Sequence, residues 1–267
     1  MAKMEQISVS AYAKVNFTLD ILGREGGYHL LDSLVSTVDL CDRVTARRRT
    51  DADCTVAMRG VGAEAIAPDS NALRAAQAFV REFGTDGADI AIERRIPVGA
   101  GLGSSSADAA GVLNALARLY AVTDTVRLKA VADALGSDTG YLLTGGYARI
   151  TGRGERVQPI ADMPCLYLLI LCPQAGMPTA RCFAAYDRLG ARQAPDGEGD
   201  RPSEGGGGAR GACLRQRPHA GGMLVRCADR AYAAGSGGAL PLRRGHDGFG
   251  QRVFRRIRTG IGVPCGA

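Results

Sequence analysis

The chain has 267 residues, of which 46% are hydrophobic and none is tryptophan, so it is long enough to bury the core of one large domain or two small ones. It has no basic leader and no apolar run long enough for a bilayer, so we expect a soluble, cytoplasmic protein with no membrane partner. The net charge of +6 would suit a nucleic-acid partner, but it is concentrated in residues 191–267, which hold 13 arginines against six acidic residues.

Hydrophobic periodicity predicts alternating strands and helices over the first 190 residues. We expect strands at residues 6–22 and 35–46, a helix at 71–83, a strand at 90–95, helices at 107–120 and 125–135, and strands at about 142–150 and 165–172. This order indicates a mixed α/β (α+β) fold. The eight cysteines are scattered without a Cys-x-x-Cys pair, so they indicate neither a metal site nor a disulfide framework.

A glycine- and serine-rich loop leads directly into the predicted helix at 107–120. Glycines let the backbone approach an anion, hydroxyls add donors, and the helix start contributes the positive end of its dipole, so the segment favours phosphate binding over a plain turn. The candidate nucleotide-binding residues are Pro97, Val98, Gly99, Ala100, Gly101, Leu102, Gly103, Ser104, Ser105, Ser106 and Ala107. The spacing matches neither a Walker A loop nor a dinucleotide-binding turn.

Residues 101–110, Gly-Leu-Gly-Ser-Ser-Ser-Ala-Asp-Ala-Ala, are very similar to the central ATP-binding motif of the GHMP kinases, which include galactokinase, homoserine kinase and mevalonate kinase. The Lys14-Val-Asn16 and Gly27-Tyr28-His29 segments resemble those members that phosphorylate a cytidyl diphosphate sugar alcohol. The resemblance runs from about residue 7 to about residue 187 and implies a two-domain GHMP fold with an N-terminal domain of the ribosomal-protein-S5-domain-2-like type.

The resemblance also implies the chemistry. ATP with Mg²⁺ would phosphorylate the 2-hydroxyl of 4-diphosphocytidyl-2-C-methyl-D-erythritol, a small-molecule substrate of the non-mevalonate isoprenoid pathway. Lys14 and Asp138 are the implied catalytic pair, with Asp138 as the base that takes the hydroxyl proton. The alternatives are a solvated strand lysine and a helix-terminal cap. Residues 139–141 depart from the family pattern.

Three further residues are implied to bind substrate: Asn16, Tyr28 and His29. The tyrosine would stack on a pyrimidine and the histidine would bond to its edge, although such a pair also occurs at a packed strand end. Asp108 is a candidate metal ligand and equally a first-turn carboxylate that complements the helix dipole. Residues 69–71 resemble the stretch near the adenine pocket.

We expect three segments: an ATP-binding domain at 1–160, the start of a C-terminal domain at 161–190, and an out-of-frame, low-complexity, disordered tail at 191–267. The resemblance implies an Asn-Asp-Leu helix start and a Met-Thr-Gly-Ser-Gly-Ser motif. Both can be decoded, over residues 216–218 and 245–257, if the reading frame is shifted by one base. The tail charge is then a coding artefact, and no nucleic-acid partner is expected. Another GHMP small-molecule kinase and an inactive remnant stay open as alternatives.

Overall fold

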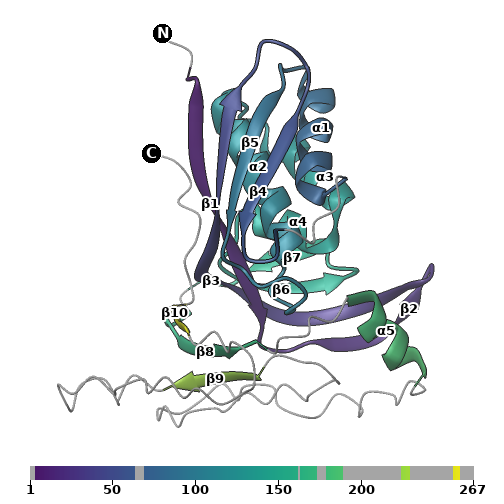
Figure 1. The fold of residues 1–267 in the computed structure, drawn as a ribbon. Coiled ribbons are helices and arrows are strands. Elements are labelled where there is room, and N and C mark those ends of the chain that lie inside the picture. The colour runs from purple at the N-terminus through teal and green to yellow at the C-terminus, as the bar shows by residue number, and fades with distance from the viewer. Residues whose placement is uncertain are drawn as a thin grey trace, which may run out of the picture.

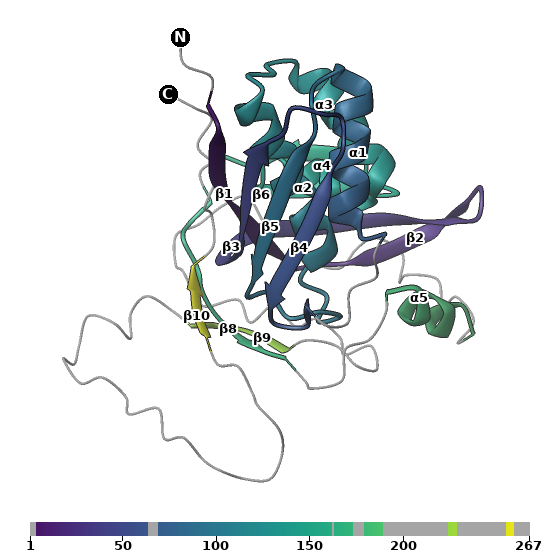
Figure 2. The ribbon, with the colours of Figure 1, turned by 45° about the horizontal axis from the view of Figure 1, so that its top comes forward.

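The computed structural model describes residues 4–63, 69–161, 163–172, 179–188, 224–228 and 255–258. Most of them form one mixed sheet with helices packed on one of its faces (Figures 1 and 2). The seven strands of this sheet are β1 (Gln6–Asn16), β2 (Asp20–Glu25), β3 (Tyr28–Arg48), β4 (Thr55–Gly60), β5 (Ala88–Arg94), β6 (Tyr147–Gly152) and β7 (Arg156–Pro159). The main path runs β4-β5-β3-β6-β7, and β1 and β2 pair with β3 beside it.

The long strand β3 organises the sheet because it pairs with four other strands along its 21 residues. The C-terminal half pairs with β1 and β5, with Val44 opposite both Val9 and Ile92, and the pairing with β1 continues to Val35. The other half pairs with β2 and β6. The end of β1 therefore lies close to β6, although the two are more than a hundred residues apart in the sequence.

Four helices cover the sheet: α1 (Asn71–Phe83), α2 (Ser104–Leu119), α3 (Thr125–Leu135) and α4 (Ser137–Leu142). Helix α2 lies in the middle and is buried over most of its length, which its small side chains allow. A Cβ atom on Gly111 would lie 2.7 Å from the Ala11 Cβ and 2.8 Å from the Val44 Cγ2. Glycine at this position lets the helix backbone approach β1 and β3 closely, and so holds the start of α2 near the end of β1.

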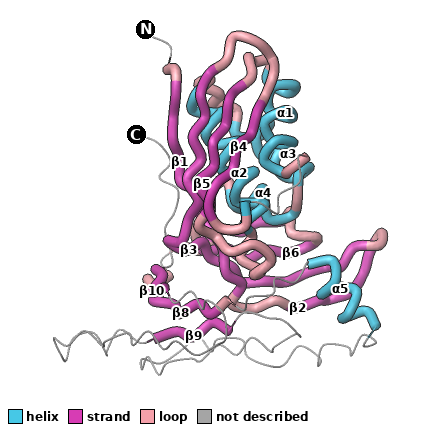
Figure 3. The backbone as a smooth tube through the Cα atoms, in the orientation of Figure 1, coloured by secondary structure: helices cyan, strands magenta, loops and turns pink. Residues whose placement is uncertain are grey.

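A second, three-stranded antiparallel sheet has the order β10-β8-β9, built from β8 (Tyr167–Leu171), β9 (Leu224–Ala228) and β10 (Arg255–Arg258). Helix α5 (Thr179–Arg188) follows β8 (Figure 3). Strands β9 and β10 belong to the segment predicted as an out-of-frame tail, and the rest of 191–267 lies outside the described residues. The proposed division into three segments stays a prediction.

The predicted helices at 71–83 and 125–135 are confirmed with the same bounds. The strand expected at 6–22 is divided into β1 and β2, the strand at 35–46 extends to Tyr28–Arg48, and the next helix begins earlier, at Ser104. The expectation of a strand starting at Leu142 was wrong, because Leu142 ends α4 and the strand begins at Tyr147. Strands β4 and β7 and helices α4 and α5 were not predicted.

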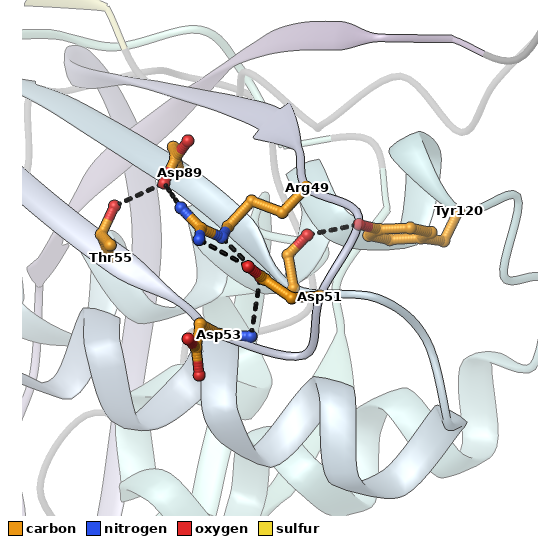
Figure 4. A network of polar contacts seen from close by, with 7 residues as sticks. Arg49, Asp51, Asp53, Thr55, Asp89 and Tyr120 are labelled. Carbon is orange, nitrogen blue, oxygen red and sulfur yellow. Dashed lines mark hydrogen bonds and ion pairs between the residues drawn. The ribbon is translucent and has the colours of Figure 1, made fainter.

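A polar network ties the strand ends together at the end of β3 near Arg48. Arg49 lies between Asp51 and Asp89, and Thr55 donates to the same Asp89 carboxylate (Figure 4). Tyr120 donates to the carbonyl of Gly87 on the same side. No described helix is long and apolar enough to cross a membrane.

Candidate active site

The glycine-rich loop has the backbone that close approach to an anion requires. Gly99, Gly101 and Gly103 have φ values of 68°, 75° and 73°, in the left-handed region that favours glycine. A Cβ atom on Gly101 would meet nothing within 4 Å, so the loop faces open space there. Alternating left-handed residues turn successive N–H groups to one side, as anion-binding loops do.

Helix α2 begins directly after this loop, and no side chain caps its first N–H groups at Gly103. Uncapped N–H groups at a helix start, together with the positive end of the helix dipole, suit a phosphate. The three predicted serines differ in their contacts. The Ser104 hydroxyl is buried and accepts from Arg94, and the Ser105 hydroxyl accepts from Asn71 at 2.9 Å. Ser106 lies on the same turn and is half-buried.

The structure brings the two predicted catalytic residues together beside the loop. Lys14 Nζ lies 3.4 Å from Asp138 Oδ2 and donates to the Asn16 side chain. The β1–β3 pairing is irregular between Tyr12 and Lys14, and the Lys14 N–H donates instead to the carbonyl of Leu102 at 3.0 Å. This bond attaches the lysine backbone to the glycine-rich loop.

Lys14 is further held by its surroundings. Its side chain is only 11% exposed, and a Cβ atom on Gly103 would lie 3.1 Å from its Cγ. Asn16, which accepts from the ammonium, donates to the Ser33 hydroxyl at 2.6 Å, and this hydroxyl donates to the carbonyl of Thr18. An ammonium and a carboxylate thus meet beside the glycine-rich loop.

Tyr28 and His29 lie at the start of β3, and their surroundings differ. Tyr28 is 58% exposed, and the guanidinium of Arg153 lies 4.5 Å from its ring centre. His29 is largely covered by α5: its ring stacks on Phe183 at 4.7 Å, and its Nε2 lies 2.7 Å from Asp187 Oδ1. The sequence analysis missed Arg153, Phe183 and Asp187. An aromatic pair three residues apart, Phe183 and Tyr186, was the available signal for α5.

Asp108 is buried against Arg94 and does not face the open space beside the glycine-rich loop. Its side chain is 4% exposed and its Oδ2 lies 3.4 Å from Arg94 Nη2. Asp42 shares the same arginine at 4.0 Å and accepts from the backbone N–H groups of Arg95 and Ile96. Burial raises the pKa of Asp108 to about 8, and the neighbouring Asp42 carboxylate adds to the increase. Burial also raises the pKa of Asp42.

This geometry favours a structural role for the Asp108 side chain over a role as a metal ligand. Its carboxyl group is turned to Arg94, inside the protein, and the described residues contain no group of three His, Cys, Asp or Glu side chains that could hold a metal ion. Asp108 and Ser104 lie one turn apart on α2 and both contact Arg94, so the cluster attaches the helix start to β5.

Comparisons with known proteins agree with these features. Residues 70–147 match the family described as GHMP kinases N terminal domain. The 4-diphosphocytidyl-2-C-methyl-D-erythritol kinase of Anaeromyxobacter dehalogenans (strain 2CP-C) is 40% identical over 94% of this chain and 86% of its own length. The kinase of the same name from Polaromonas sp. (strain JS666 / ATCC BAA-500) is 41% identical over 66% of this chain and 60% of its own length.

Among solved structures, a crystal structure of 4-(cytidine 5'-diphospho)-2C-methyl-D-erythritol kinase matches with a TM-score of 0.57 and 36% identity, over 67% of this chain and 64% of that one. The chain thus spans most of the Anaeromyxobacter relative and less than two thirds of the Polaromonas relative and of the solved structure. The loop, the lysine–aspartate pair and these matches together identify the chain as a GHMP kinase that belongs to the 4-diphosphocytidyl-2-C-methyl-D-erythritol kinase family.

Proposed function

We propose that this chain transfers the γ-phosphoryl group of ATP to the 2-hydroxyl of 4-diphosphocytidyl-2-C-methyl-D-erythritol, in the cytoplasm and as a step of isoprenoid precursor synthesis. The observation that carries the proposal is the Lys14–Asp138 pair, at 3.4 Å, beside an uncapped helix start and a glycine-rich loop. The names of the relatives supply the substrate.

The loop of residues 97–107 would bind the ATP phosphates through backbone N–H groups of its glycine-rich part and of the start of α2, helped by the dipole of α2. The open space over Gly101 fits such a group. Mg²⁺, which the resemblance implies, would neutralise phosphate charge when bound. Because Asp108 is buried against Arg94, it does not fit the role of a direct ligand in this conformation, and the phosphate oxygens would supply most of the coordination.

The Asp138 carboxylate would accept the proton of the substrate hydroxyl while the hydroxyl oxygen forms a bond to the γ-phosphorus. The bond from that phosphorus to the bridging oxygen breaks, and ADP leaves. The Lys14 ammonium would stabilise negative charge on the attacking oxygen and on the transferred group. Asn16 would hold the ammonium in place through the bond from Lys14 Nζ.

Tyr28 and His29 would bind the cytosine. Tyr28 offers an exposed ring for stacking, and the bond of His29 Nε2 with Asp187 leaves Nδ1 to meet the polar edge of a base. Phe183 stacks on the imidazole ring of His29 and so helps to hold it in place. The proposal has no place for a nucleic acid.

The test is an ADP-release assay with ATP and 4-diphosphocytidyl-2-C-methyl-D-erythritol, run on the wild type and on Asp138→Asn. We expect the substitution to lower kcat by about a hundredfold to ten-thousandfold, with little change in Tm. Asp89→Asn, in the network at the other end of β3, is the matched control and should keep kcat. Equal kcat values for Asp138→Asn and wild type would refute the proposed mechanism.

Two alternatives are tested with the same protein. Another GHMP kinase would bind no cytidine diphosphate derivative. Such derivatives would then not compete with its substrate, and Tyr28→Ala would not change this result. An inactive remnant that no longer binds nucleotide would show no rise in Tm with ATP.

A further inference from the structure

The turn between β6 and β7 lies between the two ends of the candidate substrate site. On one side, Gly154 has φ 112°, and a Cβ atom there would lie 2.7 Å from the Ser137 Cβ. Ser137 begins α4 and immediately precedes Asp138. The turn is therefore packed against the helical turn that carries the proposed catalytic base.

The other side of the turn reaches the β2–β3 hairpin. Arg153 Cζ lies 4.5 Å from the centre of the Tyr28 ring, and its Nη2 lies 3.3 Å from the point that a Cβ on Gly26 would occupy. Tyr28 remains 58% exposed with the guanidinium in this position, so ring surface is left for a base. One turn thus connects the pyrimidine end of the site with the phosphoryl-acceptor end.

The Arg153 guanidinium has no carboxylate within ion-pair distance in the part of the chain that the structure describes, although the nearby Glu155 carboxylate accepts from the Arg153 backbone N–H. Neighbouring arginines have carboxylate partners there: Arg149 pairs with Asp32, and Arg156 lies 3.6 Å from Glu155. No ion pair of Arg153 is found among the described residues. A cation–π contact at an exposed site contributes only about 0.5–1 kcal/mol, so the guanidinium can turn towards a stronger anionic partner.

The substrate of the proposed function carries two phosphates between its cytidine and its acceptor hydroxyl. With the base on Tyr28 and the hydroxyl at Asp138, these phosphates pass the turn that joins the two residues. Arginine is suited to this anion because its planar group can donate two parallel hydrogen bonds to phosphate oxygens. We propose that Arg153 binds the diphosphate of the substrate and selects for an anionic linker; this inference rests on the proposed function.

The test compares CDP with cytidine as ligands, by calorimetric titration in about 0.15 M salt. ADP is present in excess, so that the ATP site is filled and cytidine compounds bind only at the substrate site. We expect Arg153→Gln to raise the Kd of CDP about tenfold, or about 1.4 kcal/mol, and to change the Kd of cytidine less than about twofold. Arg153→Lys should fall between, because it keeps the charge and loses the paired donors.

Arg156→Gln is the matched control, since Arg156 lies three residues after Arg153 and has a carboxylate partner. This variant should bind CDP and cytidine like the wild type. In turnover, Arg153→Gln should raise KM for the substrate and leave kcat within about twofold. Equal weakening of CDP and cytidine would overturn the inference and assign Arg153 to support of the Tyr28 ring. Unchanged CDP binding in Arg153→Gln would also overturn it, whereas a wild type that binds neither ligand would refute the proposed function as well.

Discussion

The buried cluster below the glycine-rich loop places one cation against two carboxyl groups. Arg94 faces Asp42 and Asp108, and the Ser104 hydroxyl accepts from the same guanidinium. Asp42 Oδ2 and Asp108 Oδ1 both lack a donor. A proton on one carboxyl group supplies that donor and brings the cluster to neutrality, which agrees with the raised pKa of Asp108.

This cluster makes a prediction about pH. The pKa of Asp108 is about 8 in the folded protein against an ordinary value of 3.8, so the folded state binds a proton that the unfolded state releases. Its contribution to stability is complete below the ordinary pKa and is lost as the pH rises through about 8. We expect the Tm of the wild type to fall over that range, and Asp108→Asn, which is neutral at every pH, to reduce the fall.

The measurement is Tm by scanning fluorimetry at intervals from about pH 5 to about pH 9. Asp89→Asn is the control, because its bond with Arg49 lowers the pKa of Asp89 and removes it from this range. An unchanged slope in Asp108→Asn would show that the two carboxyl groups do not share a proton.

At the scale of elements, the glycine-rich loop contacts Lys14 and is the segment that we propose binds ATP. A side chain on Gly101 would project into open space, and one on Gly103 would press on the stem of Lys14. Both residues have left-handed backbones, so alanine at either costs about 1–2 kcal/mol of strain. The two substitutions therefore separate phosphate binding from lysine placement.

We expect Gly101→Ala to raise KM for ATP more than it lowers kcat, since its methyl group occupies the space proposed for a phosphate. Gly103→Ala should chiefly lower kcat, because Lys14 must shift from Asp138. Steady-state kinetics with ATP varied at saturating second substrate measures both. The same kinetic pattern for the two variants would mean that the loop moves as one piece. The assignment of phosphate binding to Gly101 and of Lys14 placement to Gly103 would then be wrong.

The packing of α2 on the sheet gives a prediction for stability. A methyl group on Gly111 would overlap the Ala11 Cβ and the Val44 Cγ2, and such overpacking typically costs about 1–3 kcal/mol. We expect Gly111→Ala to lower the free energy of unfolding in urea by this amount and to raise KM for ATP, because the helix start is displaced with the helix. Gly23→Ala is the control, as a Cβ there meets nothing within 4 Å. A Gly111→Ala variant as stable as the wild type would mean that α2 moves away without cost.

At the scale of the whole molecule, local signals predicted some elements and not others. Helices α1 and α3 have caps that the sequence displays: Ser70 accepts from the N–H of Leu73, and Asp124 accepts from that of Arg127. Helix α4 has six residues, too few to show a helical pattern of apolar residues in the sequence, and Tyr141 within it is fully buried. Tertiary packing rather than local preference forms that helix, so the sequence analysis did not predict it and assigned its last residue, Leu142, to a strand.

The candidate site was predictable in its members and not in its arrangement. The motifs named Lys14 and Asp138, but only the pairing of β1 with β3 and the packing of α4 bring them within 3.4 Å. The burial of Asp108 and the contact of Arg153 with Tyr28 depend on residues far apart in the chain. Sequence spacing carries no information about such contacts.

We propose that the tail, residues 191–267, limits the activity of this polypeptide. The relatives imply a complete kinase, and the glycine motif expected of its C-terminal part is readable only in a shifted frame over residues 245–257, of which the structure describes only 255–257, in β10. We therefore expect the chain as written to bind ATP and CDP, which the residues of the first 190 positions would contact, and to turn over slowly. A version with the tail translated in the shifted frame should have a kcat at least about tenfold higher, equivalent to about 1.4 kcal/mol of barrier.

The comparison needs both proteins at equal concentration, with kcat from the ADP-release assay and ATP binding from the rise in Tm. Resequencing the gene across codons 185–215 shows whether one base is inserted or deleted there. Equal kcat values for the two proteins would contradict the frame hypothesis and would make strands β9 and β10 part of a working C-terminal sheet. A faster shifted-frame protein with the same rise in Tm would instead assign nucleotide binding to the first 190 residues and the rate of transfer to the tail, because only the second property would then depend on the residues that differ.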